Sequence, residues 1–536
     1  MFGANGAKAP NSTPKVGGEK EKSSTNEEEI GTWLCEKGPY QEYIASLIGS
    51  IPGLKHPDPN NKDHPLKPGN ATVILLDASA AGQPNFAKEQ FKNPSGLRRH
   101  LGTTNHSHDR RRIYIMEGLA QDYVAILGGH FFMEPLFFQR QERTCVWSNR
   151  FTPTSDALPQ PSLLDPEKMF HLQYCELRQF SKTMPNSPFF CHRTGRHVGM
   201  TPARHAEKTT AGILRRKISW WCRQTTGGGW DVVILCDPQL HDLSNHDGVK
   251  YDSITNSAFQ DGYNDFLPTP DRDRAHSKPH HPHHSMLQDL CHYLENHSDL
   301  ISEKDWEKPV TSSFFLKKIV AAHYLQLVDY IKAMLPSLEL RLTTAWIEEQ
   351  DQWKSLQTIS RRCGNYRDDI EDTLLSLGYP VNEFQSPRRV DWRDDQKDFQ
   401  YIYFRLKILK QRADTLMQAM TGLASIAGNR QNLEEAKRVK RLNILALLFI
   451  PLAYTSSLFS MSEAFAPGAG KFWIYWVSAI LVLAFTFLAT WLMDTALDDA
   501  AQWKLGPLKF LGKDTDRRPR PKKTGTGLWD KHVHRG

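Results

Sequence analysis

The chain has 536 residues, enough for two or more domains, and only 39% of them are hydrophobic, which excludes a protein that lies mostly within a membrane. Its eight cysteines are scattered without a Cys-x-x-Cys pair, which excludes a zinc ribbon and is typical of reduced cytosolic thiols. The formal net charge is +7, and residues 504–536 alone carry a surplus of this size, with ten Lys/Arg against three Asp/Glu.

The N-terminal segment is polar. Gly, Ser, Pro, Lys and Glu dominate its beginning, and Pro and Asn dominate residues 51–70. This composition predicts a disordered and variable segment over residues 1–70. There is no apolar signal sequence, and the three consecutive glutamates at 27–29 are not typical of a mitochondrial transit peptide. We therefore expect the apolar segments near the other end of the chain to direct membrane insertion.

Residues 71–285 are expected to form a cytoplasmic α/β domain. Two strand-like runs, 216–225 and 230–238, flank Thr226-Gly227-Gly228-Gly229. Because glycine tolerates positive φ, this arrangement predicts a β-hairpin. A phosphate-cradling loop is the alternative, but the Gly-Lys-Ser/Thr ending and a following helix are missing. Other short β-branched or aromatic runs that predict strands are 71–79, 111–119, 123–129 and 170–180.

The last part of this domain, residues 239–285, is a His-, Pro- and Asp-rich loop. Imidazoles at high local density can bind Zn²⁺, Ni²⁺ or Cu²⁺. The prolines among them and the absence of nearby cysteines favour a weakly metal-binding loop over a defined tetrahedral site. The candidate ligands are His280, His281, His283 and His284.

Helical periodicity begins near Met286 and predicts a helical region over 286–441 that ends in one long stalk helix. Apolar residues of the stalk alternate steps of four and three, which is a heptad seam. Such a seam is typical of a coiled coil between subunits and also of a helical hairpin within one chain, and both interpretations remain open. The seam residues are Ile402, Leu406, Leu409, Ala413, Leu416, Met420, Leu423 and Ala427.

Two apolar runs, 442–461 and 472–493, contain no Asp, Glu, Lys, Arg or His. Each is long enough to cross a hydrocarbon core about 30 Å thick, which needs roughly 20 apolar residues. Buried helices of a soluble protein are the alternative, but two uncharged runs of spanning length favour transmembrane helices. Only the loop 462–471 separates them, so they predict a membrane hairpin with both ends on one side.

Basic residues flank this predicted hairpin on its outer ends. Lys437, Arg438, Lys440 and Arg441 precede the first run, and the tail 494–536 follows the second. The positive-inside rule then places both termini in the cytoplasm. The tail can also contact anionic lipid of the bilayer. We expect no nucleic-acid partner, because the topology explains the basic tail more simply.

The order of these segments resembles that of the CorA-type magnesium transporters. The run 442–461 looks like the pore helix of that family, with an internal proline at Pro451. Residues 123–141 resemble the family's pattern of a helix followed by a Pro-x-x-Phe step, and residues 219–238 are similar to a strand pair of fungal CorA-like proteins. The resemblance covers roughly residues 70 to 500 of the printed sequence.

The resemblance implies an α+β membrane protein, with an N-terminal α/β domain, a long helical stalk and two C-terminal transmembrane helices. It implies a homopentamer that transports Mg²⁺ or another divalent cation and has no cofactor. Because no Ser/His/Asp or Cys/His arrangement is supported by more than composition, we do not expect an enzyme. The plasma membrane is the expected location, with a vacuolar or other internal membrane as the alternative.

One departure concerns the family signature Gly-Met-Asn at the end of the first span, where this chain has Ser460-Met461-Ser462. In the family the asparagine carbonyl oxygens ring the pore entrance, whereas a serine offers a shorter hydroxyl. Because Mg²⁺ gives up its water reluctantly, its site should contact the hydration shell, and a serine ring is expected to do so less selectively. A membrane-anchored regulatory or interaction protein that does not conduct is therefore the alternative function.

If copies surround an axis, one face of the first span lines the conduit, with hydroxyls at its outer end and apolar residues toward the cytoplasm. Apolar constrictions can gate by dewetting. Glu463 would ring the mouth with negative charge and concentrate cations, and a solvated loop glutamate is the alternative. The predicted pore and selectivity residues are Ser460, Met461, Ser462, Glu463, Ser457, Ala453, Ile450, Ala446, Leu442 and Val439.

The resemblance further implies magnesium sensing by acidic pairs in the cytoplasm. Two acidic runs on predicted helices supply candidates, although acidic runs of this kind are usually solvated helix faces. The candidates are Asp368, Asp369, Glu371 and Asp372 in one run and Asp391, Asp394, Asp395 and Asp398 in the other.

Overall fold

The computed structural model of the chain describes residues 33–58, 66–103, 108–143, 160–185, 188–201, 210–245, 250–251, 253–268, 283, 285–339, 346–381, 391–460, 467–468 and 470–500. The chain divides into two compact units, Met1–Leu423 and Ala424–Gly536. We call the first the sheet unit and the second the hairpin unit.

The strands of the sheet unit are β1 Thr72–Ser79, β2 Ala87–Phe91, β3 Arg110–Glu117, β4 Met169–Phe180, β5 Pro188–Cys191, β6 His197–Met200, β7 Thr210–Gln224, β8 Trp230–Cys236, β9 Leu243–Asn245, β10 Lys250–Tyr251 and β11 Asn256–Ala258. Within the described residues they form one sheet of 11 strands, in the order β10-β9-β5-β6-β7-β8-β3-β1-β2. β4 pairs with β7 and with β11 beside this path. β3 and β8 pair in parallel, whereas β7 pairs antiparallel with β4, β6 and β8, so the sheet is mixed.

Helices cover both faces of this sheet. They are α1 Pro39–Leu47, α2 Pro94–Thr103, α3 Gln121–Phe131, α4 Pro135–Glu142, α6 Met286–His297, α7 Phe314–Glu339, α8 Trp346–Ser376 and the beginning of α9 Asp395–Phe459. The short 3₁₀ helices are Pro52–Leu54, Pro161–Leu163, Phe259–Asp261, Ser298–Leu300, Asp305–Glu307 and Pro309–Ser313.

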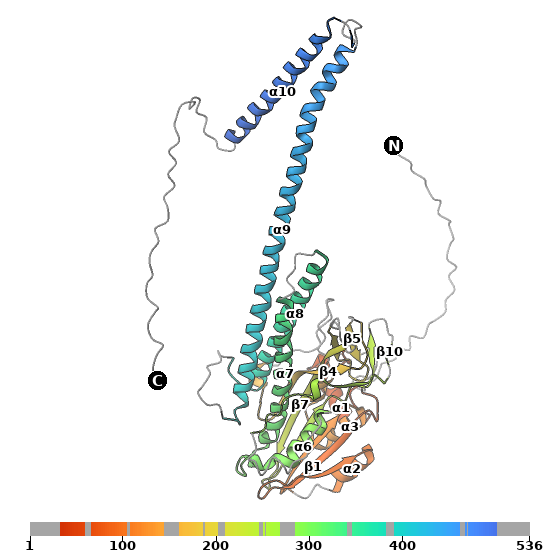
Figure 1. Ribbon diagram of the computed structural model, residues 1–536. Coiled ribbons are helices and arrows are strands. Elements are labelled where there is room, and N and C mark those ends of the chain that lie inside the picture. The colour runs from red at the N-terminus through yellow and green to blue at the C-terminus, as the bar shows by residue number, and fades with distance from the viewer. Residues whose placement is uncertain are drawn as a thin grey trace, which may run out of the picture. The chain divides into compact units, whose positions relative to one another are not determined.

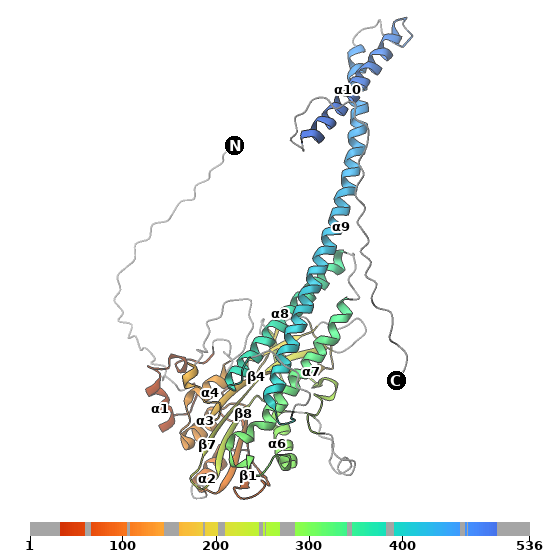
Figure 2. The ribbon, with the colours of Figure 1, turned by 90° about the vertical axis from the view of Figure 1, so that its left-hand side faces the viewer.

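The sheet has a hydrophobic core on each face, because successive side chains of a strand point to opposite faces. Ile74 and Leu76 of β1 join a core with α6, α7, α8 and α9. Val73 and Leu75 of the same strand join a second core with α1, α2, α3 and α4. Figure 1 labels these elements, and Figure 2 shows α1 to α4 on one side of the strands and α6 and α7 on the other.

The predicted β7–β8 hairpin is confirmed. Two glycines of its turn are required for different structural reasons. Gly228 has φ +81, which favours glycine. A Cβ on Gly229 would lie 2.2 Å from the carbonyl oxygen of Arg110, so the turn packs directly against the beginning of β3. Because a strand follows these glycines instead of a helix, the phosphate-loop alternative is wrong.

The predicted strands at 71–79, 111–119 and 170–180 are confirmed, but the strand at 123–129 is wrong, since these residues belong to α3. A short apolar run does not by itself distinguish a strand from a buried helix. The two glycines of the run allow helix packing, because a Cβ on Gly128 would lie 2.3 Å from the ring of Tyr40 in α1. The helix that the family resemblance implied for this segment is present.

The heptad seam of α9 packs within the chain. Its first six members, from Ile402 to Met420, are at most 9% exposed and share one core with residues of α7 and α8. Ser360 of α8 also donates a hydrogen bond to Asp414 of α9. The seam ends at Leu423, which is 43% exposed. Of the two interpretations of the heptad, the structure shows the intramolecular one over residues 402–420.

The hairpin unit consists of the rest of α9, which runs without a break to Phe459, and α10 Phe472–Ala500. Both helices contain apolar windows of spanning length, with mean hydropathy 1.8 and 2.1. Only 11% and 6% of these windows are buried, whereas a core helix of a soluble protein would be mostly buried. The chain thus combines an N-terminal mixed-sheet domain, a helical region and two C-terminal apolar helices.

Candidate functional site

In the hairpin unit α9 is buried only near its end, at Pro451 and Thr455. Thr455 of α9 and Ala479 of α10 have 4% and 2% of their surfaces exposed. At the end of α9 the ring of Phe459 meets Tyr475 of α10, with ring centroids 5.9 Å apart. Thr455 donates its hydroxyl hydrogen to the carbonyl of Leu452 at 3.0 Å, so this hydroxyl bonds back to its own helix.

The predicted pore face lies on the opposite side of α9. At about 100° per residue, its members lie roughly 140° to 180° around the helix from Thr455. All seven that the structure describes are exposed, and Ile450 and Leu442 are 67% and 64% exposed. From residue 425 to residue 446 every side of α9 is exposed, so burial distinguishes this face from the others only near Pro451 and Thr455. Its described members are Val439, Leu442, Ala446, Ile450, Ala453, Ser457 and Ser460.

The uncovered face changes character along its length. Ser457 and Ser460 provide hydroxyls near the end of α9, whereas Leu442 and Val439 make the other end apolar. Within the described residues no hydrogen bond of the Ser457 hydroxyl to its own helix is found, in contrast to Thr455. The remaining predicted site residues, Met461, Ser462 and Glu463, lie outside the described residues and stay predictions.

Aromatic side chains close the hairpin where α10 begins. The ring of Phe472 stacks on Tyr475 at 5.9 Å and lies 6.5 Å from Trp476. The sequence pattern did not reveal the contact of Tyr475 with Phe459. This contact ties together the two helix ends that flank the signature residues.

Of the four histidines predicted as metal ligands, the structure describes only His283. Its Nδ1 lies 3.4 Å from a carboxylate oxygen of Asp289, and its ring centroid lies 4.0 Å from that of Tyr263. Across the described part of the chain, no group of three or more His, Cys, Asp or Glu side chains could hold a metal ion. His280, His281 and His284 lie outside that part, so their metal binding stays a prediction.

The acidic residues before α9 have local structural roles. Asp394 caps the helix, because its carboxylate accepts a hydrogen bond from the backbone N–H of Lys397 at 3.1 Å. Asp391 accepts one from the backbone N–H of Arg393 at 3.1 Å and so stabilises the preceding turn. These two sensing candidates are therefore used to begin the helix.

The acidic run of α8 is also partly paired. Asp369 is buried and lies 3.3 Å from Arg215 of β7. Burial raises the pKa of Asp369 to about 6, although Arg215 acts in the opposite direction. Asp368 pairs with Arg367 at 2.7 Å. Asp368 and Asp369 thus have cationic partners within their own chain.

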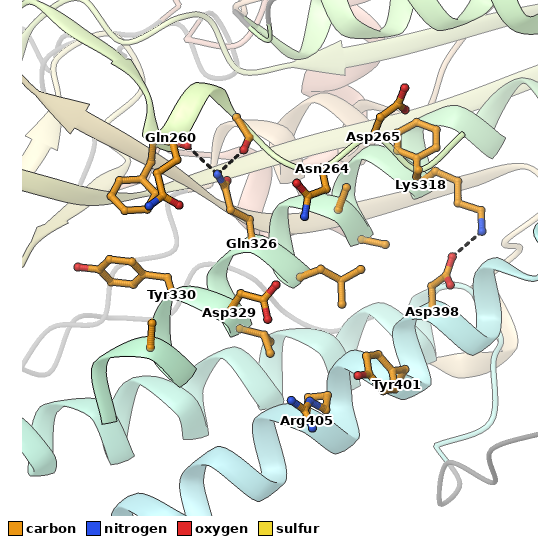
Figure 3. Close-up of a pocket in the computed structure, with 18 of the residues that line it drawn as sticks. Gln260, Asn264, Asp265, Lys318, Gln326, Asp329, Tyr330, Asp398, Tyr401 and Arg405 are labelled. Carbon is orange, nitrogen blue, oxygen red and sulfur yellow. Dashed lines mark hydrogen bonds and ion pairs between the residues drawn. The ribbon is translucent and has the colours of Figure 1, made fainter. Parts of the chain in front are cut away.

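A cavity of about 1110 Å³ lies between α7, the beginning of α9 and the loop after β11 (Figure 3). Gln326 of α7 holds this loop, since its amide donates to the carbonyls of Phe259 and Gly262 at 2.8 and 2.7 Å. Gln260 and Asp261 have φ of 50° and 63°, an uncommon conformation for residues other than glycine. The sequence pattern did not predict this cavity.

Comparison with known proteins finds a similar family for the C-terminal part of the chain. The sequence model of a family described as "CorA-like Mg2+ transporter protein" matches residues 297–494. This segment is similar to that family. It contains α7, α8, α9 and the apolar part of α10, and therefore every described residue of the uncovered α9 face.

One solved structure that matches is "The complete structure of CorA magnesium transporter from Methanocaldococcus jannaschii", which is 9% identical. The match covers 78% of this chain and 96% of that chain, with a TM-score of 0.32. No curated protein sequence matches the chain significantly. The similarity to the CorA-like family rests on the sequence match over residues 297–494.

Proposed function

We propose that the protein is a CorA-like integral membrane transporter or channel for divalent cations of the Mg²⁺ type. One observation carries the proposal. Inside the segment that matches the family, α9 presents an exposed face with hydroxyls at one end. In a bilayer such a face must contact lipid, further copies of the chain, or water in a conduit.

The composition of this face favours other copies and water over lipid. Small residues allow helix backbones to approach each other closely in a membrane. Ala446, Ala453 and Ser457 are small and lie on this one face. We therefore propose a homo-oligomer around a central axis, with the pentamer that the family resemblance implies. Both ends of the hairpin then lie on the cytoplasmic side, where the basic tail meets the membrane surface.

Permeation through such an assembly needs no covalent chemistry. A membrane potential supplies about 2.3 kcal/mol per elementary charge per 100 mV. Ser460 and Ser457 would contact the water shell of the cation, which suits an ion that keeps its water. The apolar section at Leu442 and Val439 would close the path when it dewets. Glu463 would raise the cation concentration at the mouth.

A second candidate is a membrane-anchored regulatory protein that does not conduct. The residues Ser460-Met461-Ser462 favour it, because no amide carbonyl stands where the family signature has asparagine. A shorter hydroxyl reaches less far into an axial path than an amide does.

Flux through the purified full-length protein in liposomes separates the two candidates. With an inside-negative potential, we expect uptake of Mg²⁺, Co²⁺ and Ni²⁺ above that of empty liposomes, with weak discrimination among the ions. The oligomeric state of the same sample is measured in detergent. A well-formed oligomer without flux above empty liposomes would contradict transport and support the anchored protein.

A further inference from the structure

Two consecutive lysines of α7, Lys317 and Lys318, have buried side chains, which are 11% and 5% exposed. A buried ammonium group is unfavourable unless it is paired. Aromatic rings lie near both groups, because Lys317 Nζ is 5.7 Å from the ring centroid of Phe170 and Lys318 Nζ is 5.6 Å from that of Phe314. Rings alone do not balance the charge, so the ionic partners decide the role of these lysines.

Both partners belong to the first turn of α9. Lys317 Nζ lies 3.1 Å from a carboxylate oxygen of Asp395, and Lys318 Nζ lies 2.5 Å from one of Asp398. Residues three apart on a helix share a face, so both carboxylates turn toward α7. The second pair is drawn as a dashed line in Figure 3, where it stands at the edge of the cavity.

Tyr379 completes the first pair. Its hydroxyl accepts a hydrogen bond from Lys317 Nζ at 3.0 Å and donates one to Asp395 at 2.8 Å. The ammonium, the phenol and the carboxylate therefore form a closed triangle. Such a network is worth more when every member is satisfied than when one is missing.

Four aspartates within residues 391–398 would otherwise gather negative charge at this point. Carboxylate oxygens in such number are the ligands that hard divalent cations prefer. The structure instead places two ammonium groups of the same chain there. Across the described residues no cluster of His, Cys, Asp and Glu suits a metal ion, which agrees with this arrangement.

We infer that Lys317 and Lys318 are positioning residues that serve as fixed counter-ions for the start of α9, so that its attachment to α7 needs no dissociable cation. α9 continues as one helix to Phe459. If the proposed transport function holds, on which this consequence rests, the position of the pore helix at its cytoplasmic start does not respond to the divalent-cation concentration.

The test follows hydrogen exchange of the backbone amides of residues 395–402 in the full-length protein in detergent, with Mg²⁺ or with EDTA. In the wild type we expect equal protection in both conditions. In K317M/K318M we expect exchange faster by roughly tenfold or more, because the carboxylates lose their partners. Mg²⁺ should restore part of this protection, since the freed carboxylates can then bind it.

The matched control is K332M, which changes an exposed lysine of the same helix and should leave exchange unchanged. If K317M/K318M does not fold, K318M/D398N removes one ammonium group and its carboxylate together. In that variant the hydrogen exchange of residues 395–402 should stay close to that of the wild type. It should also be the same with Mg²⁺ and with EDTA.

Two results would overturn the inference. One is protection of residues 395–402 that depends on Mg²⁺ in the wild type, and the other is wild-type exchange in K317M/K318M. Flux is measured on the same preparations. Absence of flux in the wild type would contradict the proposed function, whereas the exchange data would still decide the role of the two lysines.

Discussion

The two ends of α9 meet opposite environments although they belong to one helix. Near its beginning, Ile402 and Leu406 are fully buried against other helices of the sheet unit. In the hairpin unit, Leu442 and Ile450 are 64% and 67% exposed. The apolar stripe of the first region is used by the chain itself, whereas that of the second is left for lipid or other copies. A heptad seam is therefore no evidence for an oligomer here, and the membrane end is where such evidence must be sought.

The largest difference between the two regions of α9 is expected in the free energy of unfolding when a leucine of each region is truncated to alanine. L406A removes buried methyl groups and should lower the free energy of unfolding by about 2 to 5 kcal/mol. L442A changes an exposed side chain and should alter it by less than about 0.5 kcal/mol. Unfolding of both full-length variants in the same detergent measures the difference. An equal loss in L442A would show that Leu442 is packed in the folded protein, either within one chain or between copies.

The stability of the sheet unit should also depend on pH. Burial lowers the pKa of His323 on α7 to about 4, with Glu176 and Asp289 acting against this shift and His283 and Arg216 reinforcing it. The unfolded chain takes up a proton below pH 6.5, whereas the folded chain does so only near pH 4. Stability should therefore fall as the pH falls through this window, by at most about 3 kcal/mol.

The variant H323Q should flatten this dependence, because it removes the group that titrates. H56Q is the matched control, since His56 is exposed. Thermal unfolding of the full-length protein between pH 4 and pH 7 measures the slope. The same slope in H323Q and in the wild type would assign it to other groups.

The smallest effect is expected at the mouth of the proposed conduit. E463Q should reduce cation uptake into liposomes by a few-fold at low salt, because a ring of charge concentrates cations. At high salt the difference should disappear, since screening acts over about 3 Å at 1 M. Uptake that is unchanged at low salt would remove this role from Glu463.

Much of the fold could be predicted from local patterns. The glycines before Trp230 predicted the β7–β8 turn, whereas the pore face assigned from the register of α9 stays a prediction. The run 123–129 was misassigned to a strand, because it is too short for periodicity to show which structure it adopts.

Contacts between distant residues could not be predicted in this way. The pair of Lys318 with Asp398 joins positions 80 residues apart, and a helical pattern gives no sign of such a partner. The heptad of α9 revealed an apolar stripe but did not identify the helices that cover it. The only local sign of these ion pairs was the presence of two adjacent lysines in the apolar beginning of α7. Their role becomes clear from the position of Asp395 beside Lys317.

Two matched substitutions test whether the uncovered face of α9 lines a cation path, as proposed above. A453L places a larger side chain on that face, and A484L makes the same change at an exposed position of α10. Flux of Mg²⁺ into liposomes, corrected for the amount of inserted oligomer, should fall by tenfold or more in A453L, if the added volume raises the barrier by about 1.4 kcal/mol. It should stay at the wild-type level in A484L. Equal flux in both variants, or loss of flux in A484L alone, would show that this face of α9 does not line the cation path.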